Sequence, residues 1–346
     1  MSGTSERTVS EPEKFVFDER VDTLNVRIVN GAVNVVGTDD GPARVEVTEL
    51  DGPPLKVSLR GSTLTVTYED LPWKGFLKWL DRKGWQRHAV ISLAVPQHTR
   101  VEVGVVGAGA VISGISGPTS VQGVNGDTTL VGLSGSVRAD TVAGSVEAQS
   151  LSGDLKVNTV SGDLTVVEGS GSTVKADSVS GNMVLDLDPA AGADVRLSTV
   201  SGEIAIRIPE PGDAEVDASS MSGTLFSAFD ELPVTGLWGA WGPPPTGSGG
   251  PCGGSGGPPG GRGRISGRIG GGSARLKATS VSGAIALLRR PPLDDPHDSG
   301  IRYGAAYSRT AGPADATADS TPDAPAGGTA GSAGPEGDAP SPRKDG

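Results

Sequence analysis

The sequence predicts an all-β protein, a single-stranded β-helix or β-solenoid of roughly 18–21 residues per coil, with one short amphipathic helix and a disordered C-terminal tail. Two observations predict this fold. A nine-residue pattern with a fixed glycine repeats in tandem through the middle of the chain. Aromatic residues make up only 4% of the chain, against 54 Gly and 26 Pro among 346 residues. Stacked strands of Val, Leu, Ile and Ala can build a core with few aromatic side chains, whereas a conventional core of this length usually contains more.

The repeat consists of six consecutive nine-residue units that span residues 115–168. Position 1 is always Ile, Val or Leu, position 3 is always Gly, and positions 5 and 7 are mostly apolar. Apolar residues that alternate with polar ones indicate a strand with one buried face. We therefore expect positions 1, 5 and 7 to point inward. Val160, Leu164 and Val166 should be buried, and Lys156 and Thr165 should be exposed. The Ser-Gly pair should form the turn, because Gly tolerates positive φ.

Beyond the repeat, the spacing between the glycines widens to 19, 21 and 21 residues, at Gly181, Gly202 and Gly223. The extra residues fall at alternate corners, in segments 188–193 and 209–214. A coil of two nine-residue halves, stacked in parallel from coil to coil, explains this alternation. An antiparallel meander or sandwich is the alternative topology.

The remaining chain divides by composition. Residues 15–290 are expected to form the solenoid domain, because alternating strand patterns precede the repeat and residues 264–288 return to it. Residues 60–62 look like a hairpin turn between two such strands. Residues 1–14 are polar and are expected to be disordered, and segment 242–263, with 17 Gly or Pro in 22 residues, reads as a flexible loop. Residues 291–346, with nine acids against four bases, predict a disordered acidic tail.

Charge and composition exclude several function classes. A net charge of −12 argues against nucleic-acid binding, which needs a basic surface. The single cysteine, Cys252, rules out an intramolecular disulfide framework. Neither a secretory leader nor a run of ~20 apolar residues is visible. We therefore expect a cytoplasmic protein, with a peripheral position at the inner face of the membrane as the alternative.

Residues 73–88 stand out because they contain three of the five Trp residues and five bases against one acid. At helical spacing, apolar and basic residues separate onto two faces. One interpretation is a helix that docks on a protein partner or an anionic membrane surface. The other is a helix that caps an open end of the solenoid. The docking hypothesis names these residues: Trp73, Lys74, Phe76, Lys78, Trp79, Arg82, Lys83 and Trp85.

No pattern in the sequence indicates catalysis, a cofactor or a metal. Calcium-binding nonapeptide repeats need an Asp at a fixed offset in every unit, but here Asp follows the glycine only at Asp127, Asp154 and Asp163. We expect these residues to form turns. Segment 104–109, GVVGAG, lacks the following helix that a dinucleotide loop requires.

The histidines, the cysteine and the acidic residues of the repeat do not indicate a catalytic or metal site either. The three histidines, His88, His98 and His297, are too far apart in sequence for a zinc motif. Cys252 has no neighbouring base that would activate a thiol. A polysaccharide-cleaving enzyme would need several acids on one solenoid face, which the spacing of Asp154 and Asp163 does not provide. We therefore expect no cofactor, no metal and no enzyme activity.

The tandem units, Val or Leu followed by Ser-Gly and then Asp, Ser, Asn or Glu, resemble the bacterial putative-adhesin family of unknown function, whose fold is called a toastrack β-helix. The resemblance runs from about residue 15 to residue 288 and is most specific in 115–224 and 280–287. It implies a single-stranded β-helix and an association with membrane proteins of cell-envelope stress. The expected function is a non-enzymatic binding or scaffold module linked to envelope stress or membrane-associated assembly. The alternative is a cytoplasmic structural protein that polymerises end to end.

Overall fold

The computed structural model describes residues 4–39, 41–68, 87–189, 191–235 and 263–290. The chain divides into two units, Met1–Leu293 and Asp294–Gly346, and all described residues belong to the first. The described residues form 24 β-strands and no helix, so the all-β prediction is confirmed. The expected loop 242–263 and the expected tail 291–346 lie outside the described residues, apart from Gly263.

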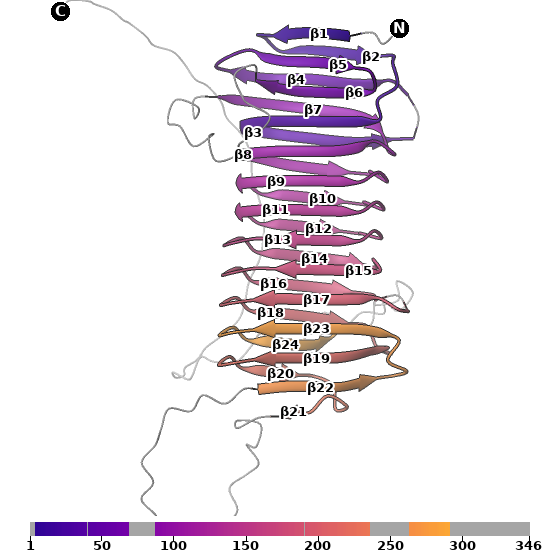
Figure 1. Ribbon diagram of the computed structural model, residues 1–346, viewed down its shortest axis with the longest axis vertical. Helices are drawn as coiled ribbons and strands as arrows, with labels where there is room; N and C mark the ends of the chain where they lie inside the picture. The colour runs from indigo at the N-terminus through magenta and orange to yellow at the C-terminus, as the bar shows by residue number, and fades with distance from the viewer. Residues whose placement is uncertain (1–3, 40, 69–86, 190, 236–262, 291–346) are drawn as a thin grey trace, which may run out of the picture. The chain divides into compact units, whose positions relative to one another are not determined.

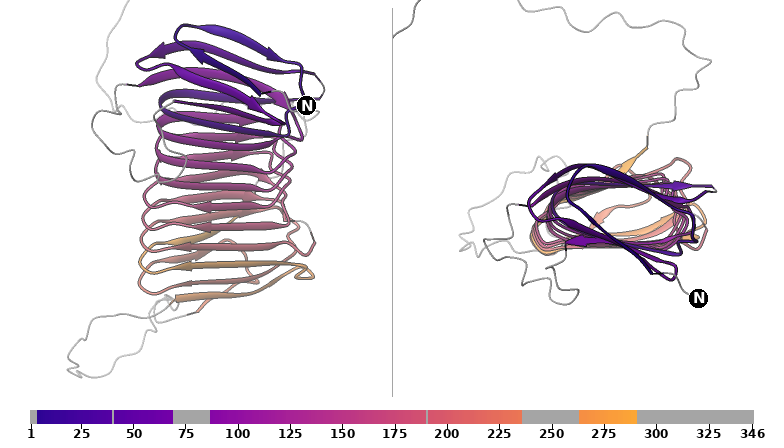
Figure 2. Two further views of the ribbon diagram at one scale, coloured as in Figure 1. Left: turned by 45° about the horizontal axis from the view of Figure 1, so that its top comes forward. Right: turned by 90° about the horizontal axis from the view of Figure 1, so that it is seen from above.

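The strands stack as flattened coils, and each coil contributes one strand to each of two opposed faces (Figures 1 and 2). Equivalent strands pair in parallel, as the sequence predicts. Val137 pairs with Leu155, Leu155 with Val174, and Val174 with Val195, so the coil lengthens from 18 to 21 residues. The parallel register excludes the antiparallel meander for this part of the chain.

Face 1 contains one strand from each coil, together with antiparallel strands at the two ends of the stack. In spatial order its strands are β1 (Thr4–Val9), β5 (Leu55–Arg60), β6 (Thr63–Tyr68), the first half of β3 (Thr23–Thr38), the first half of β8 (Arg100–Ser113), β9 (Thr119–Asn125), β11 (Val137–Ala143), β13 (Leu155–Asn158), β15 (Thr173–Asp177), β17 (Asp194–Thr199), β23 (Ala274–Ser280), β19 (Ala214–Ser220), β22 (Gly263–Ile269) and β21 (Val234–Thr235).

Face 2 lies opposite face 1 across the core. In spatial order its strands are β2 (Glu13–Phe17), β4 (Ala43–Asp51), β7 (His88–Pro96), the second half of β3, the second half of β8, β10 (Thr128–Val131), β12 (Val146–Gln149), β14 (Leu164–Gly169), β16 (Met183–Leu187), β18 (Ile204–Ile208), β24 (Ile285–Arg289) and β20 (Leu225–Ser227). One hydrophobic core fills the space between the faces.

The N-terminal end of the stack is antiparallel and corrects two expectations. Residues 4–9, expected to be disordered, form β1, which pairs with β5, and β2 begins at Glu13 and pairs with β4. The alternating patterns at residues 24–28 and 32–36, which precede the repeat and predict two separate strands, form one 16-residue strand, β3, which passes from face 1 to face 2. The hairpin turn between β5 and β6 is confirmed, with Gly61 at φ +62°.

The C-terminal end does not follow the order of the sequence. The strands β23 and β24 lie between β17/β18 and β19/β20, although β19 and β20 come earlier in the chain (Figure 1). The antiparallel strand β22 then closes face 1 beside β19. We expected the coils to stack in sequence order. Every coil shares one pattern of apolar positions and corner glycines, so its sequence does not specify its neighbour.

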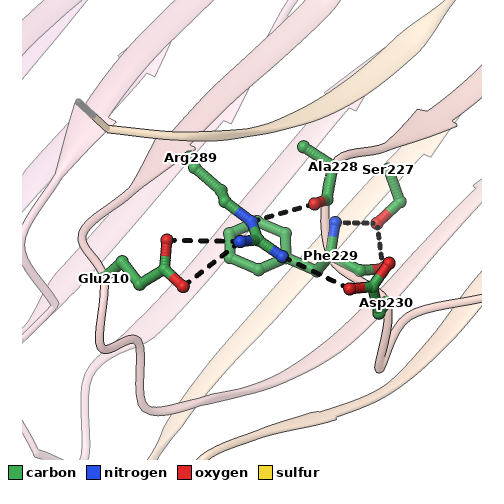
Figure 3. A network of polar contacts seen from close by, with 6 residues as sticks. All are labelled: Glu210, Ser227, Ala228, Phe229, Asp230 and Arg289. Atoms are coloured by element: carbon green, nitrogen blue, oxygen red, sulfur yellow. Dashed lines mark hydrogen bonds and ion pairs between the residues drawn. The ribbon is translucent and has the colours of Figure 1, made fainter.

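A short loop after β20 closes the C-terminal end of the core. Phe229 and Leu232 are buried there. Arg289 holds this loop (Figure 3): its Nε donates to the carbonyl of Ala228 at 2.9 Å, and its guanidinium lies 5.4 Å from the Phe229 ring centre. The same guanidinium pairs with Glu210 at 3.2 Å and reaches Asp230 at 3.8 Å.

The corner glycines have a different role from the one expected. The repeated glycines such as Gly162 and Gly202 do not have φ in the left-handed region. A Cβ on Gly162 would lie 1.9 Å from the carbonyl oxygen of Gly144, and one on Gly202 would lie 1.8 Å from that of Gly181. Glycine is therefore required because adjacent coils approach too closely for any side chain.

Position 1 of the nine-residue unit was expected to be buried, and it is buried at only one of the two corners of each coil. Ile115, Leu133 and Leu151 are buried, whereas Val160 is 47% exposed. Positions 5 and 7 are confirmed, since Leu164 and Val166 are buried. Lys156 and Thr165 point outward but are half-buried rather than fully exposed.

Three further sequence expectations can be placed. Segment 104–109 lies within strand β8 and forms no phosphate-binding loop. His88, the last residue of the expected helix, is the first residue of strand β7, and residues 73–86 lie outside the described residues. In the described part of the chain no helix is long and apolar enough to cross a membrane.

Candidate functional site

The corner that leads from face 1 to face 2 has a repeated motif, Ser or Thr, then Val or Met, then Ser (Ala at residue 143), then Gly, which we call the Val corner. Its first hydroxyl is buried and accepts a hydrogen bond from the glycine N–H, as Thr159 does from Gly162 at 3.0 Å. Its second hydroxyl donates to the coil above, as Ser161 does to the carbonyl of Val142 at 3.2 Å. With the Thr buried and the strand alternating, the apolar residue between them points into solvent.

The outward residues of successive Val corners form a continuous row, which we call the Val ridge. Its members are each 42–49% exposed, and in spatial order they are Val142, Val160, Val179, Val200, Val281 and Met221. Adjacent coils are ~4.8 Å apart, so the row extends over about 24 Å. Isolated exposed apolar residues need no explanation, but a contiguous row of six makes this corner a candidate interaction surface.

A row of bases runs beside the ridge on face 1, and we call it the basic column. Five consecutive strands of face 1 place a base at the same outward register position. In spatial order these are Arg138, Lys156, Lys175, Arg196 and Lys277. Like charges at ~4.8 Å repel one another by roughly 1 kcal/mol per pair even in water. This arrangement contrasts with the net charge of −12 for the whole chain.

Acidic neighbours offset part of this charge. Asp140 pairs with Arg138 at 2.7 Å, Asp177 with Lys175 at 3.3 Å, and Asp194 with Arg196 at 2.6 Å.

Two bases of the column form no such ion pair. Lys156 and Lys277 make no ion pair with any described residue, and the next outward residues on their strands are Asn158 and Thr279. These two ammonium groups are the ones available to an anionic ligand.

Two shallow grooves border the basic column. One, of about 490 Å³, crosses face 1 from β8 to β15 and includes Arg138, Lys156 and Lys175 in its lining. The other, of about 680 Å³, lies between the column and the ridge near β17, β23 and β19. Both lie on one side of the stack, so the basic column, the grooves and the Val ridge form one continuous surface.

The docking residues expected from the sequence, Trp73 to Trp85, lie outside the described residues. The structure does describe the two ends of that segment. Tyr68 ends β6 in line with the start of the Val corner, and Arg87 stacks over its ring at 5.4 Å. His88 begins β7 beside Asn30, just past the same corner. The segment therefore leaves and re-enters the solenoid at the corner that carries the ridge farther along the stack.

Several of the other residues considered from the sequence make contacts that hold the fold together. The carboxylates of Asp127 and Asp163 accept backbone N–H groups from the next coil, from Ser145 at 3.0 Å and Asn182 at 2.8 Å. His88 lies 3.4 Å from Glu49. Among the described residues, no three His, Cys, Asp or Glu side chains gather as a metal site. Cys252 and His297 lie outside the described residues.

Shifted pKa values likewise fall at structural positions. The pKa of Asp213 is lowered by hydrogen bonds from the hydroxyl and the backbone of Ser273, which tie the turn before β23 to the start of β19. Burial lowers the pKa of Arg27 within β3.

Sequence reasoning missed the Val ridge and the basic column, although both left a signal. The ridge residues are all preceded by Ser or Thr, whereas the buried Ile115 and Leu133 are preceded by Gly. The basic column becomes visible only when units are compared at the coil length rather than at nine residues. Each base then falls directly over the next.

A comparison with protein families agrees with this architecture. The Toastrack DUF4097 model matches residues 20–233. The chain belongs to the Toastrack DUF4097 family. The match confirms the resemblance drawn from the tandem Ser-Gly units. No curated protein matches the sequence.

Two solved structures resemble the Toastrack chain at low identity. A "putative cell adhesion protein" from Clostridium sporogenes is 9% identical with a TM-score of 0.24, covering 81% of this chain and 100% of the other. A "putative lipid binding protein" from Parabacteroides distasonis is 16% identical with a TM-score of 0.35, covering 57% of this chain and 89% of the other. At these scores neither comparison carries an argument about function.

Proposed function

We propose that this protein is a non-enzymatic binding module that docks on an anionic membrane surface, at the cytoplasmic face, through the Val ridge and the basic column. The observation that carries the proposal is the parallel course of the two rows. An apolar row beside a basic row has the chemistry of an interfacial membrane-binding surface, in which apolar groups enter the headgroup boundary and bases contact anionic lipids.

The magnitudes favour reversible binding. A base near an anionic leaflet contributes about 1 kcal/mol at most, and three of the five bases are partly neutralised by aspartates. Each ridge side chain is already half-buried, so its insertion adds less than the ~1.5–3 kcal/mol of a fully buried aliphatic residue. Several such contributions give binding that weakens with salt, because exposed charges are screened beyond ~8 Å at physiological ionic strength.

The segment that contains Trp73, Lys74, Phe76, Lys78, Trp79, Arg82, Lys83 and Trp85 supports the same proposal by its composition. Trp favours the membrane interface, and the bases add to the attraction for anionic lipid. Because the segment's two ends lie at the Val corner, its contribution would add to that of the ridge.

Vesicle co-sedimentation with matched charge reversals tests the proposal. Lys156→Glu removes an unpaired base from the basic column, and Arg207→Glu removes an exposed base, without an ion pair to described residues, from face 2. We expect Lys156→Glu to weaken binding to phosphatidylglycerol vesicles about tenfold at low salt, from one lost attraction and one gained repulsion. Arg207→Glu should have a much smaller effect. Equal loss in both variants would show that only net charge matters and would refute the site.

The apolar row needs its own variant. Val160→Ser with Val179→Ser removes apolar surface where the side chains already face solvent, so the fold should tolerate it. Weaker binding that persists at high salt is the expected result. If the double variant binds like the parent, the ridge does not enter the membrane.

A second candidate function is a scaffold that polymerises end to end. The observation that favours it is the open outer edge of β1 and of β2, each of which pairs with only one strand among the described residues. Such an edge can add a strand from another chain. Sedimentation velocity over a concentration series tests this candidate, and a single monomeric species at all concentrations would exclude it.

A further inference from the structure

We infer that the groove of about 680 Å³ at the C-terminal end of the Val ridge binds a lipid phosphate monoester. This inference rests on the proposed function, because it names the headgroup that the membrane-docking surface selects. The side chains that line this groove differ in chemistry from those along the rest of the basic column.

The groove is built from three adjacent strands in strict register. Farther up the stack, the outward position next to each base carries an acid or amide: Asp140, Asn158 and Asp177. From β17 onward the same position carries hydroxyls instead. Ser198 of β17 pairs in register with Thr279 of β23, and Thr279 with Ser219 of β19. Figure 1 shows these three strands side by side.

These hydroxyls are available to a ligand. The side chains of Ser198, Thr279 and Ser219 have no hydrogen-bond partner among the described residues, in contrast to the hydroxyls of the Val corner. Neighbouring strands set them at intervals of ~4.8 Å, so a phosphate placed between two strands can accept from both. Thr279 can therefore share one phosphate with either Ser198 or Ser219, and a phosphate has acceptor oxygens enough for both hydroxyls and the neighbouring ammonium group.

The groove is also cationic. Lys277 projects from β23 at the same level and makes no ion pair with a described residue. The one acid in the lining, Asp217, is held by Arg264 through two contacts of 3.0 Å, so its charge is neutralised. Lys277 and Arg264 against Asp217 leave a net positive groove.

The rim of the groove indicates that the phosphate belongs to a lipid. Met221 and Val281, the last members of the Val ridge, line the side nearest the ridge and are 49% and 44% exposed. A soluble phosphate compound would gain nothing from these apolar groups, whereas the acyl region of a lipid would contact them. The insertion of β23 between β17 and β19 is what brings Lys277 and Thr279 to the ridge at this point.

The test compares two vesicle compositions of equal surface charge. One contains phosphatidic acid, a monoester with up to two negative charges, and the other contains phosphatidylglycerol, a singly charged diester. We expect the wild-type protein to prefer phosphatidic acid by roughly tenfold, the effect of one or two charge-assisted hydrogen bonds.

Three variants assign the preference to the groove. Thr279→Val keeps the outward shape of strand β23 and should abolish the preference while phosphatidylglycerol binding changes little. Lys277→Gln removes a base of the column as well, so it should weaken binding to both vesicles and also abolish the preference. Lys156→Gln, in the same column but away from the hydroxyls, should weaken binding to both vesicles equally. Circular dichroism checks that every variant retains the β fold.

The outcomes separate this inference from the proposed function. Binding to both vesicles without preference, or a preference that survives Lys277→Gln and Thr279→Val, would overturn the inference and leave membrane docking intact. Absence of binding to either vesicle would overturn both. An affinity for inorganic phosphate in solution as high as that for phosphatidic acid vesicles would assign the groove to a soluble phosphate compound and overturn the lipid form.

Discussion

The close approach of corner glycines predicts a large effect for one methyl group. In the variant Gly162→Ala the new Cβ would lie 1.9 Å from the carbonyl oxygen of Gly144, against an ordinary contact of ~3.5 Å. The coils must therefore separate by more than 1 Å at this corner, because the contact needs ~3.5 Å and only 1.9 Å is available. The rigid strands on both sides transmit the displacement to the local hydrogen bonds.

Two hydrogen bonds between the coils would be stretched or lost. They are Ser161 N–H to the Val142 carbonyl at 2.9 Å and Ser161 Oγ to the same carbonyl at 3.2 Å. At ~1 kcal/mol each, the variant should lose about 2 kcal/mol of unfolding free energy.

Urea unfolding measures this loss, and Gly109→Ala is the matched control. A Cβ on Gly109 would meet no atom closer than 3.9 Å, and its φ is ordinary. That variant should be neutral or gain ~0.5 kcal/mol, because alanine loses less backbone entropy on folding. Equal urea midpoints for the two variants would refute the close-approach explanation of the repeated glycine.

Three further predictions concern single positions. Glu168 has φ +56°, a conformation that favours glycine. Glu168→Gly should therefore raise the unfolding free energy by up to ~1 kcal/mol, even though the 2.7 Å hydrogen bond from Ser150 is lost. A lower urea midpoint would contradict this prediction. Hydrogen bonds from Ser273 lower the pKa of Asp213 in the folded protein, so its contribution is present above the ordinary carboxyl range and disappears as pH falls through the folded pKa. Thermal melts of Asp213→Ala should accordingly differ from the parent at pH 7 and converge with it in acid, and a constant difference would refute the linkage. Arg289→Ala should lose ~1–2 kcal/mol by thermal unfolding, whereas unchanged stability would show that the loop closes the core without Arg289.

The sequence predicted the straight parts of the strands well, because period-2 alternation follows directly from strand geometry. Leu164 and Val166 are buried as that alternation requires. Val160 is exposed because it lies in a corner, where the chain turns and the alternation ends. There the buried position is taken by Thr159, whose hydroxyl satisfies the glycine N–H.

The candidate site was harder to predict than the fold. The basic column depends on which residues lie over one another, and that requires the true coil length and the spatial order of the coils. Lys277 joins the column only because β23 lies between β17 and β19. The nine-residue pattern contains no information about this order, since every coil offers compatible apolar positions to every other.

The out-of-order coil has a consequence for how the chain folds during synthesis. Most coils can add to the stack as they emerge, because each pairs with the coil made just before it. The segment β19–β20 is the exception, since its native neighbour is β23–β24, which is made later. Until then β17 and β18 present an unpaired edge onto which β19 and β20 could settle in a compatible register. Escape from that arrangement requires the last coil to displace its predecessor, so we expect a slow refolding phase that Asp213→Ala and other changes near β23 alter, while changes near β9 do not.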